Sequence, residues 1–288
     1  MRRMLYALMA LGSLGATTAS AMVLVDLPRA RAWERADELI AKAQELAARE
    51  DRAGARAAVD EALRIAPGDP KARRELAMHL VSRGDIEPAL VELRAVAKAR
   101  PYDAGAAREL GELLGISGDR EGAVKWLKRA VFLDPADGLA HTMLARQLAR
   151  AGDLKGALAE AEVGARLIPR VPSAHFLLGL VRWQSEDLLG ARQSFLEALR
   201  LRPSDARAMF CLGGLAAQLD RPGEAVEYLQ QATALVPDDA TGWAAYGAAL
   251  LAARRPDDAR AAFARALKLD PQNAAAQRGM AACQTRGR

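Results

Sequence analysis

Apolar residues recur at intervals of three or four positions along most of the chain, as in Val124, Leu127 and Val131. This spacing places them on one face of an α-helix, and no segment alternates apolar and polar residues for long enough to predict a strand. A proline stands at every 34th position from Pro67 onward and is expected to end a helix. These prolines are Pro67, Pro101, Pro135, Pro169, Pro203, Pro237 and Pro271. The pattern predicts an all-α protein in which one helical hairpin is copied in tandem.

Each copy, or repeat, is taken to end two residues after its proline. Its eighth residue is always alanine or glycine, its twentieth is always alanine, and its 24th is apolar. Small residues let two helices approach closely while large ones fill the space beside the contact, so each repeat is expected to be a pair of antiparallel helices stacked on the next pair. The seven repeats cover residues 36–69, 70–103, 104–137, 138–171, 172–205, 206–239 and 240–273.

The turn inside the hairpin is also visible in the sequence. Glycine is followed by aspartate at residues 84–85, 118–119 and 152–153, in the middle of three repeats. Glycine ends a helix in a left-handed cap, and aspartate caps the start of the next helix. Although 288 residues ordinarily suggest two domains, a repeat array of this kind is expected to form one elongated domain.

A 34-residue hairpin with leucine and a small residue at positions seven and eight, alanine at 20 and proline at 32 resembles the tetratricopeptide repeat. The resemblance covers residues 36–273, and the sequence departs from it at Lys42 and Arg182, where the family has apolar residues. It implies a right-handed α-solenoid of helix–turn–helix repeats. It also implies that the protein binds a protein or peptide partner in a concave groove lined by the first helix of each repeat.

The resemblance further implies which residues face that groove, namely positions 2, 5, 6, 9, 12 and 13 of each repeat. In repeats four to six these positions hold large apolar residues and arginines, whereas in repeats two and three they are largely charged. We therefore expect repeats four to six to bind a peptide or helix with apolar anchors and an acidic group. The alternative is that the apolar residues only pack against neighbouring helices. The predicted groove residues are Met143, Arg146, Arg150, Phe176, Leu177, Leu180, Trp183, Arg207 and Phe210.

Composition excludes some other classes of partner and site. The net charge is +5, but arginines and acidic residues are interspersed, without a long basic run or an aromatic ladder, so nucleic acid is not an expected partner. Cys211 and Cys283 lie two repeats apart, beyond the reach of a disulfide, and are expected to be free.

Catalytic and metal-binding motifs are not recognisable. His141 and His175 both occupy position four of their repeats, where we expect partly buried packing rather than a metal site. No nucleophile motif, phosphate loop or dinucleotide motif is found, so no cofactor, metal or enzymatic activity is expected. An enzyme subunit with an active site assembled from distant repeats is a less favoured alternative.

The amino-terminal 25 residues have two leading interpretations. Residues 4–25 carry no charge and follow Arg2 and Arg3, which fits a secretory signal peptide. They also fit an uncleaved transmembrane anchor, since about 20 apolar residues span a bilayer. A buried first helix of the repeat domain is less favoured, because the segment is apolar on every side. Both leading interpretations place the repeats on the extracytoplasmic side, anchored to the inner membrane or released into the periplasm.

Two short segments flank the repeats. Residues 26–35 are expected to form a connector in which Pro28 interrupts any continuous helix. Residues 274–288 are expected to form a polar capping helix followed by a tail. The expected function is a non-catalytic scaffold that supports assembly of an envelope complex. Self-assembly into a homo-oligomer through exposed apolar surfaces is the alternative.

Overall fold

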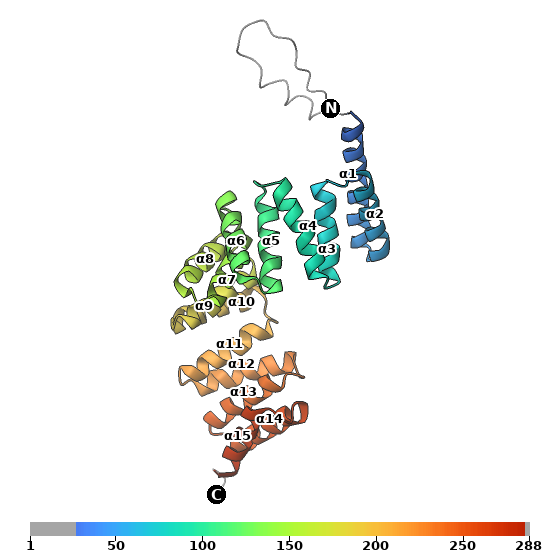
Figure 1. The fold of residues 1–288 in the computed structure, drawn as a ribbon. Helices are drawn as coiled ribbons and strands as arrows, with labels where there is room; N and C mark the ends of the chain where they lie inside the picture. Colours follow the sequence, from blue (N-terminus) through green and yellow to red (C-terminus); the bar gives the residue numbers. More distant parts are fainter. Residues whose placement is uncertain (1–26, 286–288) are drawn as a thin grey trace. The chain divides into compact units, whose positions relative to one another are not determined.

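The computed structural model describes residues 27–285, and within that range every regular element is an α-helix (Figure 1). The predicted all-α class is therefore confirmed for this part of the chain. The helices are α1 (Leu27–Ala48), α2 (Arg52–Ile65), α3 (Pro70–Ser82), α4 (Ile86–Ala99), α5 (Ala104–Ser117), α6 (Arg120–Leu133), α7 (Gly138–Arg150), α8 (Leu154–Leu167), α9 (Pro172–Gln184), α10 (Leu188–Leu201), α11 (Ala206–Gln218), α12 (Pro222–Leu235), α13 (Ala240–Ala252), α14 (Pro256–Leu269) and α15 (Ala274–Thr285).

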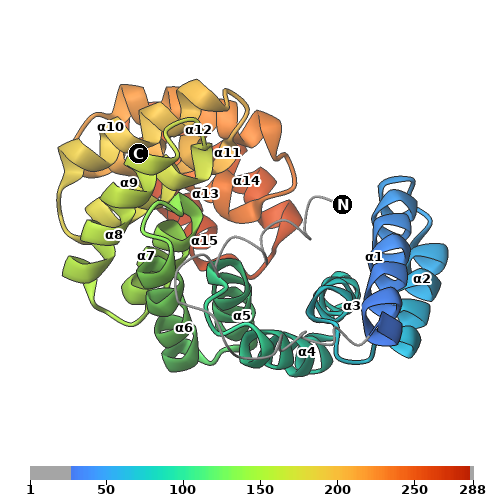
Figure 2. The ribbon, with the colours of Figure 1, turned by 90° about the horizontal axis from the view of Figure 1, so that it is seen from above.

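The described residues form two compact bodies, an N-terminal body up to His79 and a C-terminal body from Leu80. In the N-terminal body α1 packs along α2 as the hairpin of repeat 1. In the C-terminal body the hairpins are α5/α6, α7/α8, α9/α10, α11/α12 and α13/α14, and the second helix of each also contacts the first helix of the next. This body is therefore a solenoid of stacked hairpins. Figure 2 shows α7 and α9 towards the inside of its curve and α6 and α8 towards the outside.

Close packing inside each hairpin depends on the small residue at position eight. A Cβ atom added to Gly111 would lie 2.8 Å from Leu127 Cγ, and one added to Gly179 would lie 2.7 Å from Phe195 Cδ1. Both large side chains occupy position 24 of the same repeat and are completely buried. All seven alanines at position 20 are also completely buried. The conserved spacing of small and large residues within this chain thus builds the contact between the two helices.

The turn between the two helices has the same backbone conformation in all seven repeats. The residue at position 15 of the repeat lies in this turn and has a positive φ angle whether it is glycine or not, as in Gly118 (96°) and Arg254 (61°). The next residue is the N-cap of the second helix, and Asp119 and Asp153 at this position accept a hydrogen bond from the backbone N–H three residues later. Asp85 makes no such bond. The residues with positive φ are Glu50, Gly84, Gly118, Gly152, Glu186, Asp220 and Arg254.

Arg182 occupies a position at which the family has an apolar residue, and polar contacts explain how it is accommodated. Its side chain is 23% exposed. Arg182 Nη1 donates to Ser194 Oγ at 3.1 Å, and Nη2 donates to Glu162 Oε1 at 3.0 Å. The guanidinium group therefore joins α8, α9 and α10. Lys42, the other departure from the family pattern, is exposed.

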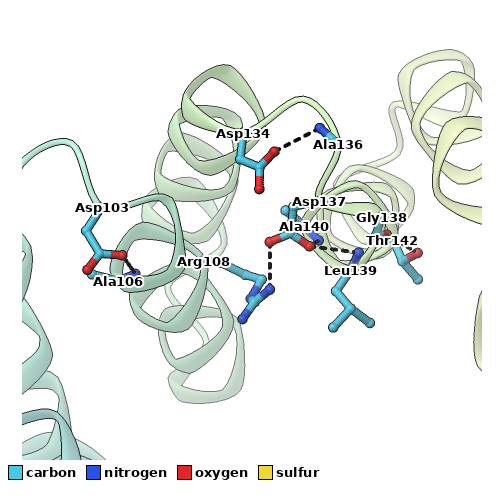
Figure 3. A network of polar contacts seen from close by, with 10 residues as sticks. All are labelled: Asp103, Ala106, Arg108, Asp134, Ala136, Asp137, Gly138, Leu139, Ala140 and Thr142. Carbon is cyan, nitrogen blue, oxygen red and sulfur yellow. Dashed lines mark hydrogen bonds and ion pairs between the residues drawn. The ribbon is translucent and has the colours of Figure 1, made fainter. Parts of the chain in front are cut away.

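A second polar contact joins repeat 3 to repeat 4 (Figure 3). Asp137 Oδ1 accepts hydrogen bonds from the backbone N–H groups of Leu139 and Ala140, both at 3.0 Å, and so caps α7. Its other oxygen, Oδ2, accepts from Arg108 Nη1 at 2.6 Å. Both side chains are largely shielded from water, which favours a charge-assisted bond between them. One carboxylate thus ends the turn before α7 and ties α7 to α5.

The segments that flank the repeats are compared with their predicted structures in turn. The predicted signal peptide or anchor, residues 1–25, lies outside the described residues. The connector expected over residues 26–35 is instead helical from Leu27, because Pro28 falls in the first turn of α1, where its missing N–H costs little. At the other end α15 packs on α13 and α14. Among the helices from α1 to α15, none is both long and apolar enough to cross a bilayer.

The left-handed turns predict the effect of one substitution. Arg254→Gly is expected to raise the free energy of unfolding by about 1 kcal/mol, because a non-glycine residue is strained at positive φ. Urea unfolding followed by circular dichroism measures the change. Gly152→Ala, at a φ of 86°, is the reciprocal control and is expected to lower stability by a similar amount. An Arg254→Gly protein no more stable than the parent contradicts the assignment of strain to this turn.

Candidate functional site

The predicted groove residues lie on three consecutive first helices of the C-terminal body, α7, α9 and α11. The three arginines, Arg146, Arg150 and Arg207, are exposed, whereas the apolar members are half-buried. None of the nine is sealed in the core. The structure places the apolar members over three different buried clusters.

The largest group lies on α9. Phe176, Leu180 and Trp183, which we call the α9 aromatic surface, all pack against the cluster that contains Phe195 and Leu212. The ring of Phe176 lies 5.7 Å from that of Phe195, and the ring of Trp183 meets Phe195 edge-on at 6.1 Å. Phe195 is completely buried. Each of the two outer aromatic rings therefore has one side on a fixed core residue and part of its surface open.

Trp183 also connects two repeats. Its indole Nε1 donates a hydrogen bond to Gln218 Oε1 on α11 at 2.7 Å. A Cβ atom added to Gly214 would lie 3.1 Å from the indole ring, so the absence of a side chain there leaves room for the tryptophan. These contacts hold the α9 aromatic surface in one orientation relative to α11.

The remaining predicted apolar residues lie on either side of this surface. Met143 and Leu177 pack against the cluster that contains Leu144 and Val181. Phe210 packs against the cluster of α12 to α15, where a Cβ atom on Gly242 would lie 2.6 Å from its ring. Packing therefore accounts for part of the surface of each of these side chains.

The three arginines differ in their electrostatic surroundings. Arg207 lies with its guanidinium carbon 5.0 Å from the centre of the Phe176 ring, and its Nη2 donates to Asp205 Oδ2 at 2.9 Å. That hydrogen bond holds the pKa of Asp205 below its ordinary value. Arg146 and Arg150, by contrast, make no hydrogen bond or ion pair with any residue in the described range. The unneutralised positive charge of this region therefore lies on α7.

Cys211 lies beside the α9 aromatic surface as a free, half-buried thiol. Burial raises the pKa of the Cys211 thiol to about 11. The thiol is therefore protonated at neutral pH and contributes to this surface as a small apolar group. Cys283, the other free cysteine, is completely buried in α15.

The two histidines at position four have a structural role that the sequence does not reveal. His175 Nε2 lies 2.9 Å from the carbonyl oxygen of Pro169, and His141 Nε2 lies 3.1 Å from that of Pro135. In repeat 7 the residue at position four is Trp243, which donates to the Pro237 carbonyl at 2.9 Å. In repeats 4, 5 and 7 the side chain at position four thus hydrogen-bonds the carbonyl of the periodic proline six residues earlier. Among the described side chains, no group of three or more histidine, cysteine and acidic residues is placed to hold a metal ion.

Comparison with known proteins agrees with this architecture. A family model described as "Tetratricopeptide repeat" matches residues 74–138, 142–206 and 176–240, and a second model of the same description matches residues 240–283. No curated protein matches the chain.

Several solved structures have the same fold. A structure of pilF from Pseudomonas aeruginosa is 20% identical with a TM-score of 0.65, covering 76% of this chain and 96% of pilF. The TPR protein YrrB is 19% identical with a TM-score of 0.56, covering 65% of this chain and 96% of YrrB. A chain of the APC/C hetero-tetramer Cut9–Hcn1 is 16% identical with a TM-score of 0.68, covering 92% of this chain and 57% of the other. With the family models matching more than half of its residues, the chain belongs to the tetratricopeptide repeat family.

Proposed function

We propose that the protein is a non-catalytic scaffold that holds a peptide or helix of a protein partner in the groove of repeats four to six. The observation that carries this proposal is the α9 aromatic surface, which is half-exposed and packs on the completely buried ring of Phe195. Aromatic residues fixed in this way lose little entropy on binding, and together with arginine they dominate the energetics of protein interfaces.

The charges near this surface indicate the orientation of the partner. The charge of Arg207 is already balanced by Asp205. This side chain therefore contributes mainly its planar guanidinium group, which lies over the Phe176 ring. Arg146 and Arg150 have no such counter-charge among the described residues. The proposed partner therefore lays its apolar anchors on α9 and its acidic group towards α7.

The comparisons support the general class of this function. Tetratricopeptide repeats act as scaffolds for protein–protein interactions, and the structure of YrrB is presented as that of a TPR protein with an unusual peptide-binding site. At 19% identity this likeness concerns the fold. It supports peptide binding as a use of such an array, whereas the residues proposed for this chain come from its own structure.

The groove proposal predicts the outcome of a capture experiment. Tagged chain is incubated with envelope extract, and captured proteins are quantified by mass spectrometry. The variant Arg146→Glu/Arg150→Glu is expected to reduce the specific partner at least about tenfold, because it reverses two exposed, unpaired charges. The control Arg166→Glu/Arg170→Glu makes the same charge change at exposed, unpaired arginines outside the groove and is expected to leave capture unchanged.

The apolar half of the groove is tested by Phe176→Ala/Trp183→Ala. This variant is expected to lose capture while its circular dichroism remains helical. Loss of the helical signal identifies the two rings as core residues, and retained capture contradicts the groove proposal. Recovery of the chain itself as the captured protein supports the homo-oligomer instead.

We further propose that the repeats act on the extracytoplasmic side of the membrane, anchored to the inner membrane or free in the periplasm, in support of envelope complex assembly. This proposal rests on the uncharged segment 4–25 that follows Arg2 and Arg3. In spheroplasts of an expressing bacterium, externally added protease is expected to digest the repeats while a cytoplasmic marker survives. Digestion only after lysis contradicts the proposal.

A further inference from the structure

A cavity of about 480 Å³ that is open to solvent lies between α6 and the C-terminal part of α7, and no predicted groove residue lines it. Its apolar lining consists of Val124, Leu148 and Ala151. Leu148 is nearly buried, so the apolar floor is part of the core between these repeats. A volume of this size lies within the range of roughly 300–1,000 Å³ that is typical of ligand pockets.

The rim of the cavity is charged. Arg120, Lys125 and Lys128 surround the apolar floor together with one carboxylate, Glu121, which gives the rim a net charge of +2. Within the described part of the chain, none of these four side chains makes a hydrogen bond or ion pair. Arg129, on the same helix, instead donates to the carbonyl of Pro101 at 2.6 Å. The cations around the cavity are therefore not used to hold the fold together.

We propose that this cavity is a second docking site, which takes one apolar side chain of a partner peptide flanked by acidic residues. The apolar side chain packs on Leu148 and removes the exposed surface of Val124 and Ala151 from water. The flanking carboxylates meet Lys125 and Lys128, whose aliphatic stems also extend the apolar wall. The site uses residues separate from those of the groove, so it does not depend on the function proposed above.

The mixed sign of the rim favours a peptide over an anionic lipid surface. Glu121 stands among the cations and repels phosphate headgroups. The same carboxylate is able to accept hydrogen bonds from the backbone N–H groups of an extended peptide. A peptide thus carries N–H donors for Glu121 as well as carboxylates for the three cations, whereas a phosphate group carries only acceptors.

A defined peptide tests this site on the full chain. The probe is a fluorescein-labelled pentapeptide with a central leucine and two aspartates on each side, and binding is followed by fluorescence anisotropy. The unaltered chain is expected to bind it with a Kd of about 1 mM or lower. Lys125→Glu/Lys128→Glu is expected to weaken binding at least about tenfold, and Ala151→Trp, which fills the cavity from an exposed position, is expected to have a similar effect.

Two controls separate the site from other sources of binding. Arg166→Glu/Arg170→Glu carries the same charge change as Lys125→Glu/Lys128→Glu but lies outside the cavity, and it is expected to bind the probe within about twofold of the unaltered chain. Arg146→Glu/Arg150→Glu is expected to do the same. An equal loss in the first control shows unspecific charge attraction, and an equal loss in the second places the peptide in the groove. Either result overturns the second site.

Three further results also overturn it. One is the absence of any anisotropy change with the unaltered chain. Another is equally tight binding of the same pentapeptide with serine in place of leucine, which shows that the apolar floor is not used. The third is binding of phosphatidylglycerol vesicles that is lost in Lys125→Glu/Lys128→Glu and is not reduced by the pentapeptide, which identifies a lipid as the occupant.

Discussion

The contact between position eight and position 24 of each repeat sets the distance between the two helices of the hairpin. Both phenylalanines at position 24, Phe195 and Phe263, face a glycine, and so does Leu229. In repeat 2 the smaller pair Ala77 and Leu93 occupies the same positions. In repeat 4 both positions hold alanine, and Ala145 and Ala161 lie in one buried cluster. The two side-chain volumes therefore compensate each other, which keeps the hairpin close-packed while its residues vary.

The candidate site follows from this contact. Gly179 lets the ring of Phe195 approach the backbone of α9, and the ring then supports Phe176 and Trp183 from below. Because Phe195 is completely buried, the rings of Phe176 and Trp183 pack on a surface that belongs to the core. The hydrogen bond from Trp183 to Gln218 holds the tryptophan in place relative to the next repeat. Polar contacts at Arg182 and Asp137 also join helices of adjacent repeats. The surface is therefore preorganised by the packing that stabilises the fold.

The sequence predicts the features whose residue types repeat and misses those whose residue types do not. The prolines and small residues recur with one period, so the hairpins and the core were predictable. The left-handed turn at Arg254 was not, because glycine is the usual signal for that conformation and is absent there. Pro28 predicts an interruption where the structure has a helix, because proline breaks a helix interior but is tolerated in a first turn.

Side-chain pairing between repeats could not be predicted from the sequence either. Arg207 and Arg146 look alike in the chain, yet only the structure shows that one is neutralised by an aspartate and the other is not. The cavity beside Lys125 is missed for the same reason, because it depends on how α6 meets α7 and not on any motif. Residue types at groove positions could be predicted from the repeat register, but their degree of burial could not.

The most direct test of the compensating contact is a double-mutant cycle of Gly179→Ala and Phe195→Leu, read as free energies of urea unfolding. The combined variant carries alanine and leucine, the residues that repeat 2 has at the same positions, Ala77 and Leu93. Phe195→Leu alone leaves a cavity and Gly179→Ala alone overpacks the contact, so the account predicts that the double variant is more stable than the sum of the single effects by about 1 kcal/mol. Strictly additive changes in the free energy of unfolding would show that the cost of a volume change at one position does not depend on the residue at the other. That result would contradict the account.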